Sequence, residues 1–368
     1  MVSKRASFGL LALLGALVPF AAQPASGSKP FTFPKDCVAC HGSEPRFPVR
    51  GVLTQYLTSG HRTIGHASYS NSEGCQMCHT NEGFVEFVKK GKVDPKEVVA
   101  NPSPIGCFTC HAPHDTGDFS LRKTTKVTLA NGGVFDRGKS NLCANCHRAV
   151  FVPANEVKPR SIPFDFWGAH HGPQADMLLG TNAYEFPGKS YSKSAHAQLP
   201  EAGCITCHMT LPKQRYALMP TIGGHSFRIG GEVHEAPKLN NAGCLGCHAD
   251  MKQAGNKDVF DRAAAADYDG DGKVETIQEE VQGLLGRIIN KQGTGLLQTM
   301  KDPLYDSKGE FIRNKVQYPI EVVGALYNYK FVKEDGSRGM HNTKYAVQLL
   351  MDSIKALDGK YDDSKRPQ

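Results

Sequence analysis

Outside six short motifs the 368-residue sequence has no cysteine, although it contains 12 cysteines in all. It has a single tryptophan, Trp167, and after residue 20 it has no apolar run long enough to cross a membrane. It also lacks a stripe of basic residues interleaved with aromatic ones, so its formal net charge of +7 does not indicate nucleic-acid binding. Because no thiol is spare, a disulfide framework is excluded, and the motifs themselves carry the information.

All six motifs have the form Cys-x-x-Cys-His, and they read CVACH, CQMCH, CFTCH, CANCH, CITCH and CLGCH in chain order. Together they use every cysteine of the chain: Cys37, Cys40, Cys75, Cys78, Cys107, Cys110, Cys143, Cys146, Cys204, Cys207, Cys244 and Cys247. This pattern is the attachment signature of c-type haem, in which both thiols bond to the porphyrin and the adjacent histidine binds the iron. One such motif is compatible with half a zinc site, but six with no cysteine left over predict six haem c groups.

Histidine is abundant enough to supply both axial ligands of every predicted iron. Six of the 15 histidines close the motifs and are the predicted proximal ligands: His41, His79, His111, His147, His208 and His248. Nine others are candidate distal ligands: His61, His66, His114, His170, His171, His196, His225, His234 and His341. Of His61 and His66 the first is preferred, and both stay candidates. An iron with two imidazole ligands is six-coordinate and closed to substrate, which suits an electron carrier.

The spacing of the motifs predicts the fold class. The motifs form a loose repeat that ends at His248, and about 60 residues per haem leave little peptide for a conventional core. We expect a multihaem cytochrome c fold of low regular secondary structure, with mainly short α-helices and loops wrapped around a haem stack. The expected parts are a signal peptide at 1–27, a hexahaem core at 28–260, an EF-hand-like calcium loop at 261–282, and a helical C-terminal tail at 283–368 that packs on the core.

Local patterns predict a few regular elements. Most motifs should form one helical turn, because both sulfurs and the imidazole must meet the same porphyrin. Apolar residues at helical spacing predict two helices in the tail. Their apolar positions are Ile277, Val281, Leu284 and Ile288 in the first helix, and Ala346, Leu350, Ile354 and Leu357 in the second. Strand signals are weak, and one hairpin is expected where residues 126–129 and 134–135 flank Asn131-Gly132-Gly133.

The N-terminal residues have the features of a secretory signal. Lys4 and Arg5 form a charged region, residues 8–20 form an apolar region, and small residues follow. The apolar region is too short for a typical membrane span. The cleavage region contains no cysteine that could carry a lipid, so a lipid anchor is excluded. We therefore expect export to the periplasm, or to the cell surface or extracellular space.

Acidic residues downstream of the sixth motif match the start of an EF-hand loop. The segment reads DYDGDGKVE, with carboxylates at loop positions 1, 3, 5 and 9 and glycine at position 6. The candidate calcium ligands are Asp267, Asp269, Asp271, Lys273 and Glu275. Position 12, where a bidentate glutamate is expected, is Gln278, and Glu279 follows it. The sequence predicts bound Ca²⁺ that fixes the tail against the core; the alternative is an acidic surface turn.

Three stretches resemble the multihaem cytochromes of metal-reducing and related anaerobic bacteria. They are CQMCHTNEGF at Cys75–Phe84, HHGPQADMLLG at His170–Gly180 and SAHAQLPEAGCITCHM at Ser194–Met209. The resemblance covers most of residues 37–350. It implies one of two functional classes: electron conduits, including hexahaem cytochromes that polymerise into extracellular nanowires, or enzymes that reduce nitrite or oxidise hydroxylamine.

A fourth stretch, DGSRGMHNTKYAVQLL at Asp335–Leu350, is similar to the His-Asn-Pro-x-Tyr-Ala segment of the nitrite reductase/hydroxylamine oxidoreductase-like superfamily. The histidine of that segment is a distal haem ligand, so the resemblance implies this role for His341, although Thr343 replaces the usual proline. The ammonia-forming nitrite reductases typically use a Cys-x-x-Cys-Lys haem. All six motifs here end in histidine, which favours the electron conduits.

The leading hypothesis is an exported hexahaem cytochrome that conducts electrons through bis-histidine haems. Its expected partners are redox partner cytochromes or extracellular electron acceptors, and a homopolymeric filament is an extension of the same hypothesis. Under it there is no catalytic residue, no nucleic-acid partner and no transmembrane span. The alternative is a multihaem reductase of nitrite, hydroxylamine or sulfur oxyanions, in which one iron lacks its distal ligand. A structural or calcium-dependent adhesion role is a third hypothesis.

Overall fold

The structure is a computed structural model that describes residues 49–63, 74–94, 99, 101–200, 202–212, 219–233, 236–249 and 262–368. Residues from Arg50 onward form one unit. The predicted signal peptide, the first motif at Cys37–His41, and the candidate ligands His66 and His234 lie outside the described residues.

The motif-bearing part of this unit consists of short helices joined by loops. The helices are α2 (Val49–Tyr56), α4 (Gln76–His79), α5 (Asn81–Lys90), α6 (Cys107–Cys110), α7 (Pro113–Thr116), α8 (Asn141–Ala144), α9 (Pro153–Glu156), α10 (Gln174–Leu179), α11 (Ala195–Gln198) and α12 (Cys204–His208). Among the described residues, three 3₁₀ turns accompany them: η1 (Gly60–Thr63), η2 (Gly138–Ser140) and η4 (Gly224–Ser226). The expectation of short helices and abundant loop is confirmed for the described residues.

Two small antiparallel hairpins are the sheet structure of the described residues. Strands β1 (Val127–Thr128) and β2 (Val134–Phe135) pair with Val127 opposite Phe135, which confirms the predicted hairpin. Strands β3 (Gly230–Val233) and β4 (Ala236–Leu239) pair with Gly230 opposite Leu239. This second hairpin was not predicted, because its sequence has no clear alternation of apolar and polar residues.

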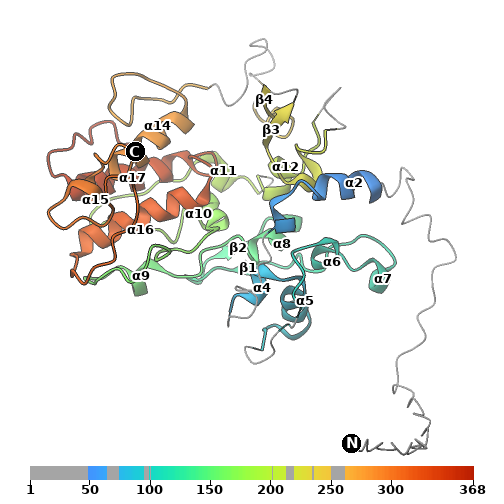
Figure 1. Cartoon of the computed structure of the whole chain (residues 1–368). Helices are drawn as coiled ribbons and strands as arrows, with labels where there is room; N and C mark the ends of the chain where they lie inside the picture. Colours follow the sequence, from blue (N-terminus) through green and yellow to red (C-terminus); the bar gives the residue numbers. More distant parts are fainter. Residues whose placement is uncertain are drawn as a thin grey trace, which may run out of the picture. The chain divides into compact units, whose positions relative to one another are not determined.

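Four helices of the C-terminal region gather on one side of the unit, where α10 lies beside them (Figure 1). They are α14 (Ile277–Ile288), α15 (Leu296–Thr299), α16 (Ile320–Asp335) and α17 (Thr343–Leu357). Helices α14 and α17 confirm the two apolar stripes. Helix α16 was not predicted, because it is buried on nearly every side and so has no polar face to give a helical period.

The main apolar core lies among these C-terminal helices. Its fully buried side chains include Leu284 of α14, Tyr327 and Phe331 of α16, and Leu350 of α17. The second buried apolar cluster is small, and it lies around the β1–β2 hairpin: Val127, Leu129, Phe135, Ala144, Ala175 and Leu178. Residues 149–183 of the motif-bearing part join the main core, for example through Trp167 and Met177, whereas the Cys-x-x-Cys-His motifs themselves contribute little buried apolar surface.

Hydrogen bonds join the C-terminal helices to the middle of the chain. Gln174 of α10 donates to the carbonyl oxygens of Glu334 and Asp335 at the end of α16, at 3.1 Å each. The hydroxyl of Tyr327 donates to the carbonyl of Phe151 at 2.9 Å. Because these bonds reach the loop after the fourth motif, the C-terminal core holds part of the motif-bearing chain in place.

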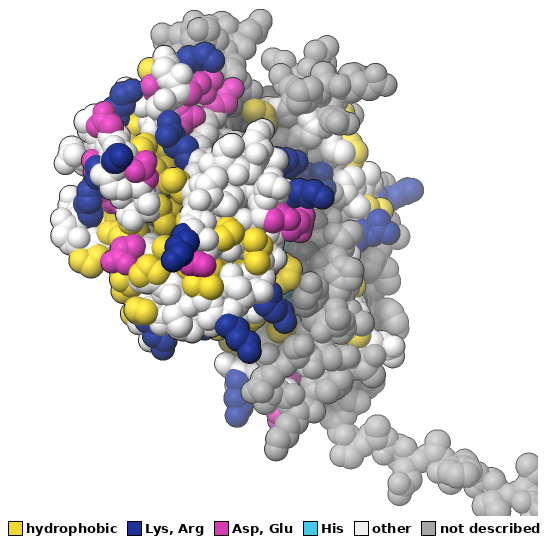
Figure 2. All heavy atoms as spheres, turned by 60° about the vertical axis from the view of Figure 1, so that its left-hand side comes forward, with side chains coloured by type: hydrophobic (Ala, Val, Ile, Leu, Met, Phe, Trp, Pro, Cys, Tyr) yellow, Lys and Arg dark blue, Asp and Glu magenta, His cyan; other side chains and the backbone are white. Residues whose placement is uncertain are grey.

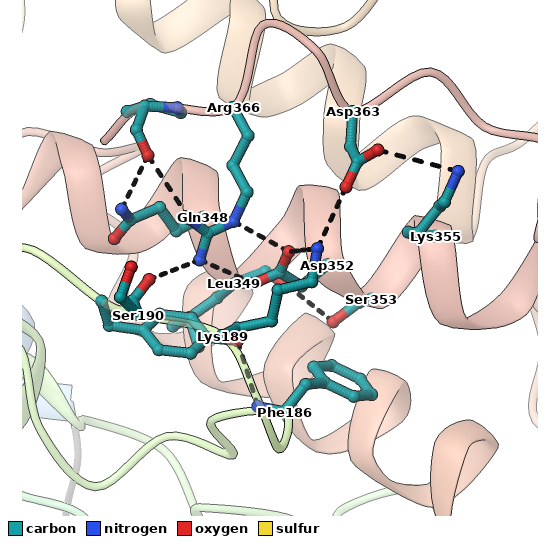
Figure 3. A network of polar contacts seen from close by, with 12 residues as sticks. Phe186, Lys189, Ser190, Gln348, Leu349, Asp352, Ser353, Lys355, Asp363 and Arg366 are labelled. Carbon is teal, nitrogen blue, oxygen red and sulfur yellow. Dashed lines mark hydrogen bonds and ion pairs between the residues drawn. The ribbon is translucent and has the colours of Figure 1, made fainter.

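A buried ion-pair network anchors the last residues of the chain to α17 (Figure 3). Arg366 donates from Nε and Nη2 to the two carboxylate oxygens of Asp352 at 2.8 and 2.9 Å, and its Nη2 also donates to the carbonyl of Ser190 at 2.7 Å. Lys189 lies 3.5 Å from Asp352 and 3.0 Å from Asp363. The guanidinium therefore ties the chain end, α17 and the segment before α11 together.

The surface of the C-terminal region mixes charges of both signs. On the face turned forward in Figure 2, Lys and Arg side chains alternate with Asp and Glu around apolar patches. This face therefore has no basic stripe of the kind that binds nucleic acid. Among the described residues, no helix has the length and apolar character needed to span a membrane.

Asp352→Ala should destabilise the protein strongly. The substitution leaves Arg366, whose side chain is 7% exposed, without its carboxylate, and breaking a buried pair costs about 3–5 kcal/mol. Thermal unfolding of the purified holoprotein measures the loss. Lys90→Ala is the control, because it removes an exposed pair with Glu86 that contributes at most about 1 kcal/mol. Equal, small effects of the two substitutions would contradict this account of the chain end.

Candidate haem-binding sites

The Cys-x-x-Cys-His motifs are numbered here as sites 1 to 6 in chain order. The structure describes five of them: site 2 (Cys75–His79), site 3 (Cys107–His111), site 4 (Cys143–His147), site 5 (Cys204–His208) and site 6 (Cys244–His248). In sites 2, 3, 4 and 6 the histidine backbone amide donates to the carbonyl of the first cysteine at 2.9–3.0 Å. At site 5 the whole motif is helix α12. One helical turn thus brings both thiols and the imidazole together, as predicted.

Each described motif histidine faces one histidine from outside the motifs. The pairs are His79 with His170, His111 with His225, His147 with His61, His208 with His341, and His248 with His196. Their ring centres are 5.9–6.4 Å apart. The structure therefore brings five of the predicted distal candidates opposite five predicted proximal ligands.

This separation fits a metal ion between the two rings. Two metal–nitrogen bonds of about 2 Å, with each nitrogen about 1.1 Å from its ring centre, place the centres about 6.2 Å apart. Aromatic contact alone allows a similar distance. It does not explain why every described motif histidine faces another histidine in a chain with 18 phenylalanines and 12 tyrosines. The pairs and the neighbouring thiols together fit haem c.

Acceptors on the Nδ1 side fix several of these rings. The Nδ1 of His111, His208 and His196 donates to the carbonyl of Phe119, Phe227 and Met340, respectively, at 2.7, 2.9 and 2.9 Å. The Nδ1 of His147 donates to Oε1 of Gln174 at 3.1 Å, and that of His341 donates to Oδ1 of Asp335 at 2.6 Å. An acceptor at Nδ1 sets the tautomer that leaves Nε2 free to bind metal, which is the usual arrangement of a metal-binding histidine.

Burial favours the neutral form of five of the paired imidazoles, and a metal ligand must be neutral. Desolvation, reinforced by the facing ring of His147, lowers the pKa of His61 to about 4. Burial and neighbouring imidazoles also lower the pKa values of His147, His170, His208 and His225. His341 is the exception: burial opposes protonation, but the buried Asp335 carboxylate outweighs it and raises the pKa.

Tight local structures present the distal candidates. His61 lies in η1 and His225 in η4, where Gln55 of α2 accepts the backbone amide of His225 at 3.0 Å. His170 adopts a left-handed backbone with φ of 70°. The C-terminal region sets His196, because Asn342 accepts the amide of Ser194, just before it, at 2.9 Å. Residues far apart in sequence therefore position each pair.

Two further candidates do not face a described motif histidine. His171 bonds through Nδ1 to Oε2 of Glu334 at 2.6 Å, and its side chain is half exposed. The ring of His114 lies 5.7 Å from that of Phe108. With His66 and His234, they remain the candidates for the partner of His41 at site 1, which lies outside the described residues.

Glycines before two motifs allow neighbouring sites to approach closely. A Cβ on Gly243, just before site 6, would lie 2.3 Å from the carbonyl oxygen of Thr206 within site 5. A Cβ on Gly203, just before site 5, would lie 2.5 Å from Oγ of Ser140, which precedes site 4. Glycine is needed at both positions because a side chain would collide with the adjacent site.

A group of three buried carboxylates forms where the calcium loop was predicted. Oxygen atoms of Asp267, Asp269 and Glu280 lie within 4.8 Å of one another. Glu280 accepts the amides of Tyr268 at 2.6 Å and Asp269 at 3.0 Å, and Oδ2 of Asp267 accepts from the distant Lys365 at 2.9 Å. Desolvation, with help from Glu280 and the neighbouring aspartates, raises the pKa of Asp269.

The third carboxylate of this group, Glu280, is not among the predicted calcium ligands. Glu279 instead caps α14, where its carboxylate accepts from the amide and hydroxyl of Thr276. Glu280, one position later, turns into the loop and is fully buried. Asp271 and Glu275 lie outside the three-residue group. Glu280 was missed because the EF-hand pattern places its last carboxylate at loop position 12 or next to it. Thr276 followed by Glu279 is the sequence pattern of a helix cap, and it could have shown that Glu279 caps α14 and that Glu280 is free to join the loop.

Gly243→Ala should disturb sites 5 and 6. Its methyl group would meet the backbone of site 5, and overpacking of this kind costs about 1–3 kcal/mol. Thermal unfolding followed at the haem Soret band measures the change. Gly246→Ala is the matched control, since it lies within the same motif and has open space around it. If both variants unfolded at the wild-type temperature, the close approach of the two sites would be wrong.

Comparison with known proteins agrees with the motifs. No protein-family model matches the chain. It is 21% identical over 336 residues to the C-type polyheme cytochrome OmcC of Geobacter sulfurreducens, and 23% identical over 341 residues to OmcB of the same species. These alignments cover 76% and 77% of this chain and 42% and 44% of the relatives, so the chain spans less than half the length of the curated relatives it matches.

Two solved structures are also similar. The outer cell wall cytochrome OcwA matches 85% of this chain and 50% of its own, with 21% identity and a TM-score of 0.48. The undecaheme cytochrome from the S-layer of Carboxydothermus ferrireducens matches 88% of this chain and 41% of its own, with 18% identity and a TM-score of 0.41. Sequence similarity to the polyheme proteins, together with the repeated Cys-x-x-Cys-His sites, makes this chain a relative of the multihaem c-type cytochromes.

Proposed function

We propose that the protein is a hexahaem electron carrier in which each iron is bound by two histidines. The facing histidine pairs at sites 2 to 6 carry this proposal, because they account for both axial positions at every described site. Haem c bound there supplies a one-electron redox centre. The chain's own residues bind it through two thiols and two imidazoles and leave no axial position for a substrate.

The surroundings of the imidazoles suit electron transfer. Hydrogen bonds at Nδ1 hold ring orientation constant, so that the iron geometry changes little when its charge changes. The acceptors are not equivalent: site 5 has a buried carboxylate, Asp335, beside His341, whereas site 6 has the carbonyl of Met340 beside His196. A carboxylate makes its histidine a stronger donor to iron, so site 5 should have a lower reduction potential than site 6.

The reductase alternative requires an iron with an open axial position. A distal histidine candidate faces the motif histidine at each of sites 2 to 6, so an open iron would have to lie at site 1. The remaining candidates His66, His114, His171 and His234 are enough to close that site as well. The electron carrier is therefore the better supported function.

Electron paramagnetic resonance of the oxidised holoprotein tests this function. We expect only low-spin iron, in two classes set by the angle between the paired rings. The near-perpendicular pairs at sites 2, 4 and 6 (79°, 78° and 88°) should give strongly anisotropic signals, and sites 3 and 5 (39° and 49°) more rhombic ones.

The control for that experiment is the same sample with added nitrite or hydroxylamine, which should leave the spectrum unchanged. A high-spin signal of about one iron per chain that shifts with either compound would overturn the carrier and support the reductase. Haem content is measured in parallel, because a chain with fewer than six haems would contradict the stoichiometry.

The physiological context of the proposal comes from the sequence and the relatives. The N-terminal signal supports export, and OcwA and the S-layer cytochrome carry cell-wall and S-layer locations in their names. We infer that the acceptors are partner cytochromes or extracellular oxidants. Filament assembly is part of the proposal through the resemblance to nanowire cytochromes; electron microscopy of the purified holoprotein tests it, and single particles under all conditions would count against it.

We also propose that Ca²⁺ binds at Asp267, Asp269 and Glu280. The EF-hand-like spacing supports this site, and so does the grouping of three buried carboxylates. Lys365, near the chain end, contacts Oδ2 of Asp267 at 2.9 Å, so a bound cation would compete with its ammonium group. Calcium would thereby link the start of α14 to the packing of the C-terminal residues.

Glu280→Gln should weaken calcium binding by about tenfold or more, because it removes a ligand charge from the group. Calorimetric titration of chelator-treated holoprotein measures the affinity. Glu279→Gln, on the neighbouring capping residue, is the matched control and should bind as the wild type does. Wild-type protein that takes up no calcium at millimolar concentration would rule out the site.

A further inference from the structure

The described sites are not equally connected, and their contacts show which of them adjoin. Sγ of Cys146 at site 4 lies 3.9 Å from the carbonyl oxygen of Met77, which is part of site 2. Oγ of Ser140, in the turn before site 4, accepts the backbone amide of Ile205, which is part of site 5, at 3.2 Å. Site 2 thus meets the second cysteine of site 4, and site 5 meets the turn that leads into site 4.

Site 3 also reaches site 4, because the rings of their distal candidates, His225 and His61, both contact Phe227. Site 6 lies beside site 5, where a Cβ on Gly243 would lie 2.3 Å from the carbonyl oxygen of Thr206. Because each motif would hold the edge of its own porphyrin, motifs in contact indicate neighbouring porphyrin edges.

Phe227 connects the axial ligands of three of these sites. Its ring centre is 4.7 Å from that of His61 at site 4 and 5.8 Å from that of His225 at site 3. Its carbonyl accepts Nδ1 of His208 at site 5 at 2.9 Å. The residue adopts a left-handed backbone with φ of 57°, which is uncommon for a side chain of this size and turns ring and carbonyl toward different sites.

We propose that site 4 is a branch point of the electron path. Sites 2, 3 and 5 each adjoin site 4, and site 6 is reached through site 5. Phe227 is the positioning residue that holds the axial ligands of sites 3, 4 and 5 close together. This inference rests on the proposed function, since it concerns the order of the same sites. A branch point allows the carrier to accept electrons at one end and release them at two others.

His61→Met tests the branch point. A methionine ligand raises the reduction potential of that iron, so site 4 stays reduced and blocks passage between its neighbours. In the partly reduced holoprotein, exchange NMR between assigned haem methyl signals should show electron exchange among sites 2, 3 and 5 slowed by about tenfold or more. Haem content and the low-spin spectrum of the variant are measured first, so that the number of haems bound per chain is known.

His225→Met is the matched control, because it raises the potential at site 3, which lies on a branch. Exchange between sites 2 and 5 should then stay at the wild-type rate. The branch point is overturned if His61→Met leaves exchange between sites 2 and 5 unchanged, or if His225→Met slows it equally. High-spin iron in the wild type would refute the carrier function without changing this order of sites.

Two measurements do not depend on either methionine variant. In the fully reduced wild type, nuclear Overhauser contacts between haem substituents should join site 4 to sites 2, 3 and 5; contacts that bypass site 4 would overturn the proposal. Phe227→Leu should shift the paramagnetic resonance signals of sites 3 and 4 while those of sites 2 and 6 stay constant. A uniform change at all sites would indicate general loosening and contradict the positioning role.

Discussion

Two imidazoles on opposite faces of one metal ion must have their ring centres about 6 Å apart, and this requirement governs where the chain can run. The five described pairs join segments that are remote in sequence. His61 lies before site 2 whereas its partner His147 belongs to site 4, and His341 lies far beyond its partner His208. With iron bound as proposed, each such pair would constrain the chain as a cross-link does, because it closes a long loop. In the motif-bearing part this coordination would take the place of a large apolar core.

The C-terminal helices complement this arrangement. They contain the main buried core, and the segment between α16 and α17 supplies the proposed distal ligand His341 together with the carbonyl of Met340 that accepts from His196; Asp335, at the end of α16, accepts from His341. The anchor of Arg366 on Asp352 closes the chain end over α17. A well-packed helical platform therefore holds the ligands of sites 5 and 6, whereas those of sites 3 and 4 are held by short turns around Phe227 and Gln55.

Much of the chemistry could be predicted from the sequence because it is local. The cysteines and proximal histidines lie within five consecutive residues, and the amphipathic helices α14 and α17 and the β1–β2 hairpin have short-range patterns. The partners of the proximal histidines could be counted but not assigned, because pairing depends on long-range geometry. His196 illustrates this: it lies eight residues before site 5 in sequence, yet it faces His248 of site 6.

Other features were missed for physical reasons that particular residues show. Helix α16 is surrounded by protein, so its sequence lacks the polar face that reveals a helix. Glu280 belongs to the acidic group because Thr276 starts α14 and thereby turns this glutamate, not Glu279, into the loop. The junction around site 4 follows from contacts between motifs, for which a single sequence has no local signal.

The central claim is that paired histidines hold iron at every described site. Anomalous diffraction at the iron absorption edge, from crystals of the haem-loaded protein, tests it most directly. The account predicts one iron peak between the rings of each pair at sites 2 to 6, bonded to both imidazoles at about 2 Å. An iron at any of these sites bound to its motif histidine alone, or to a histidine other than the facing one, would contradict it.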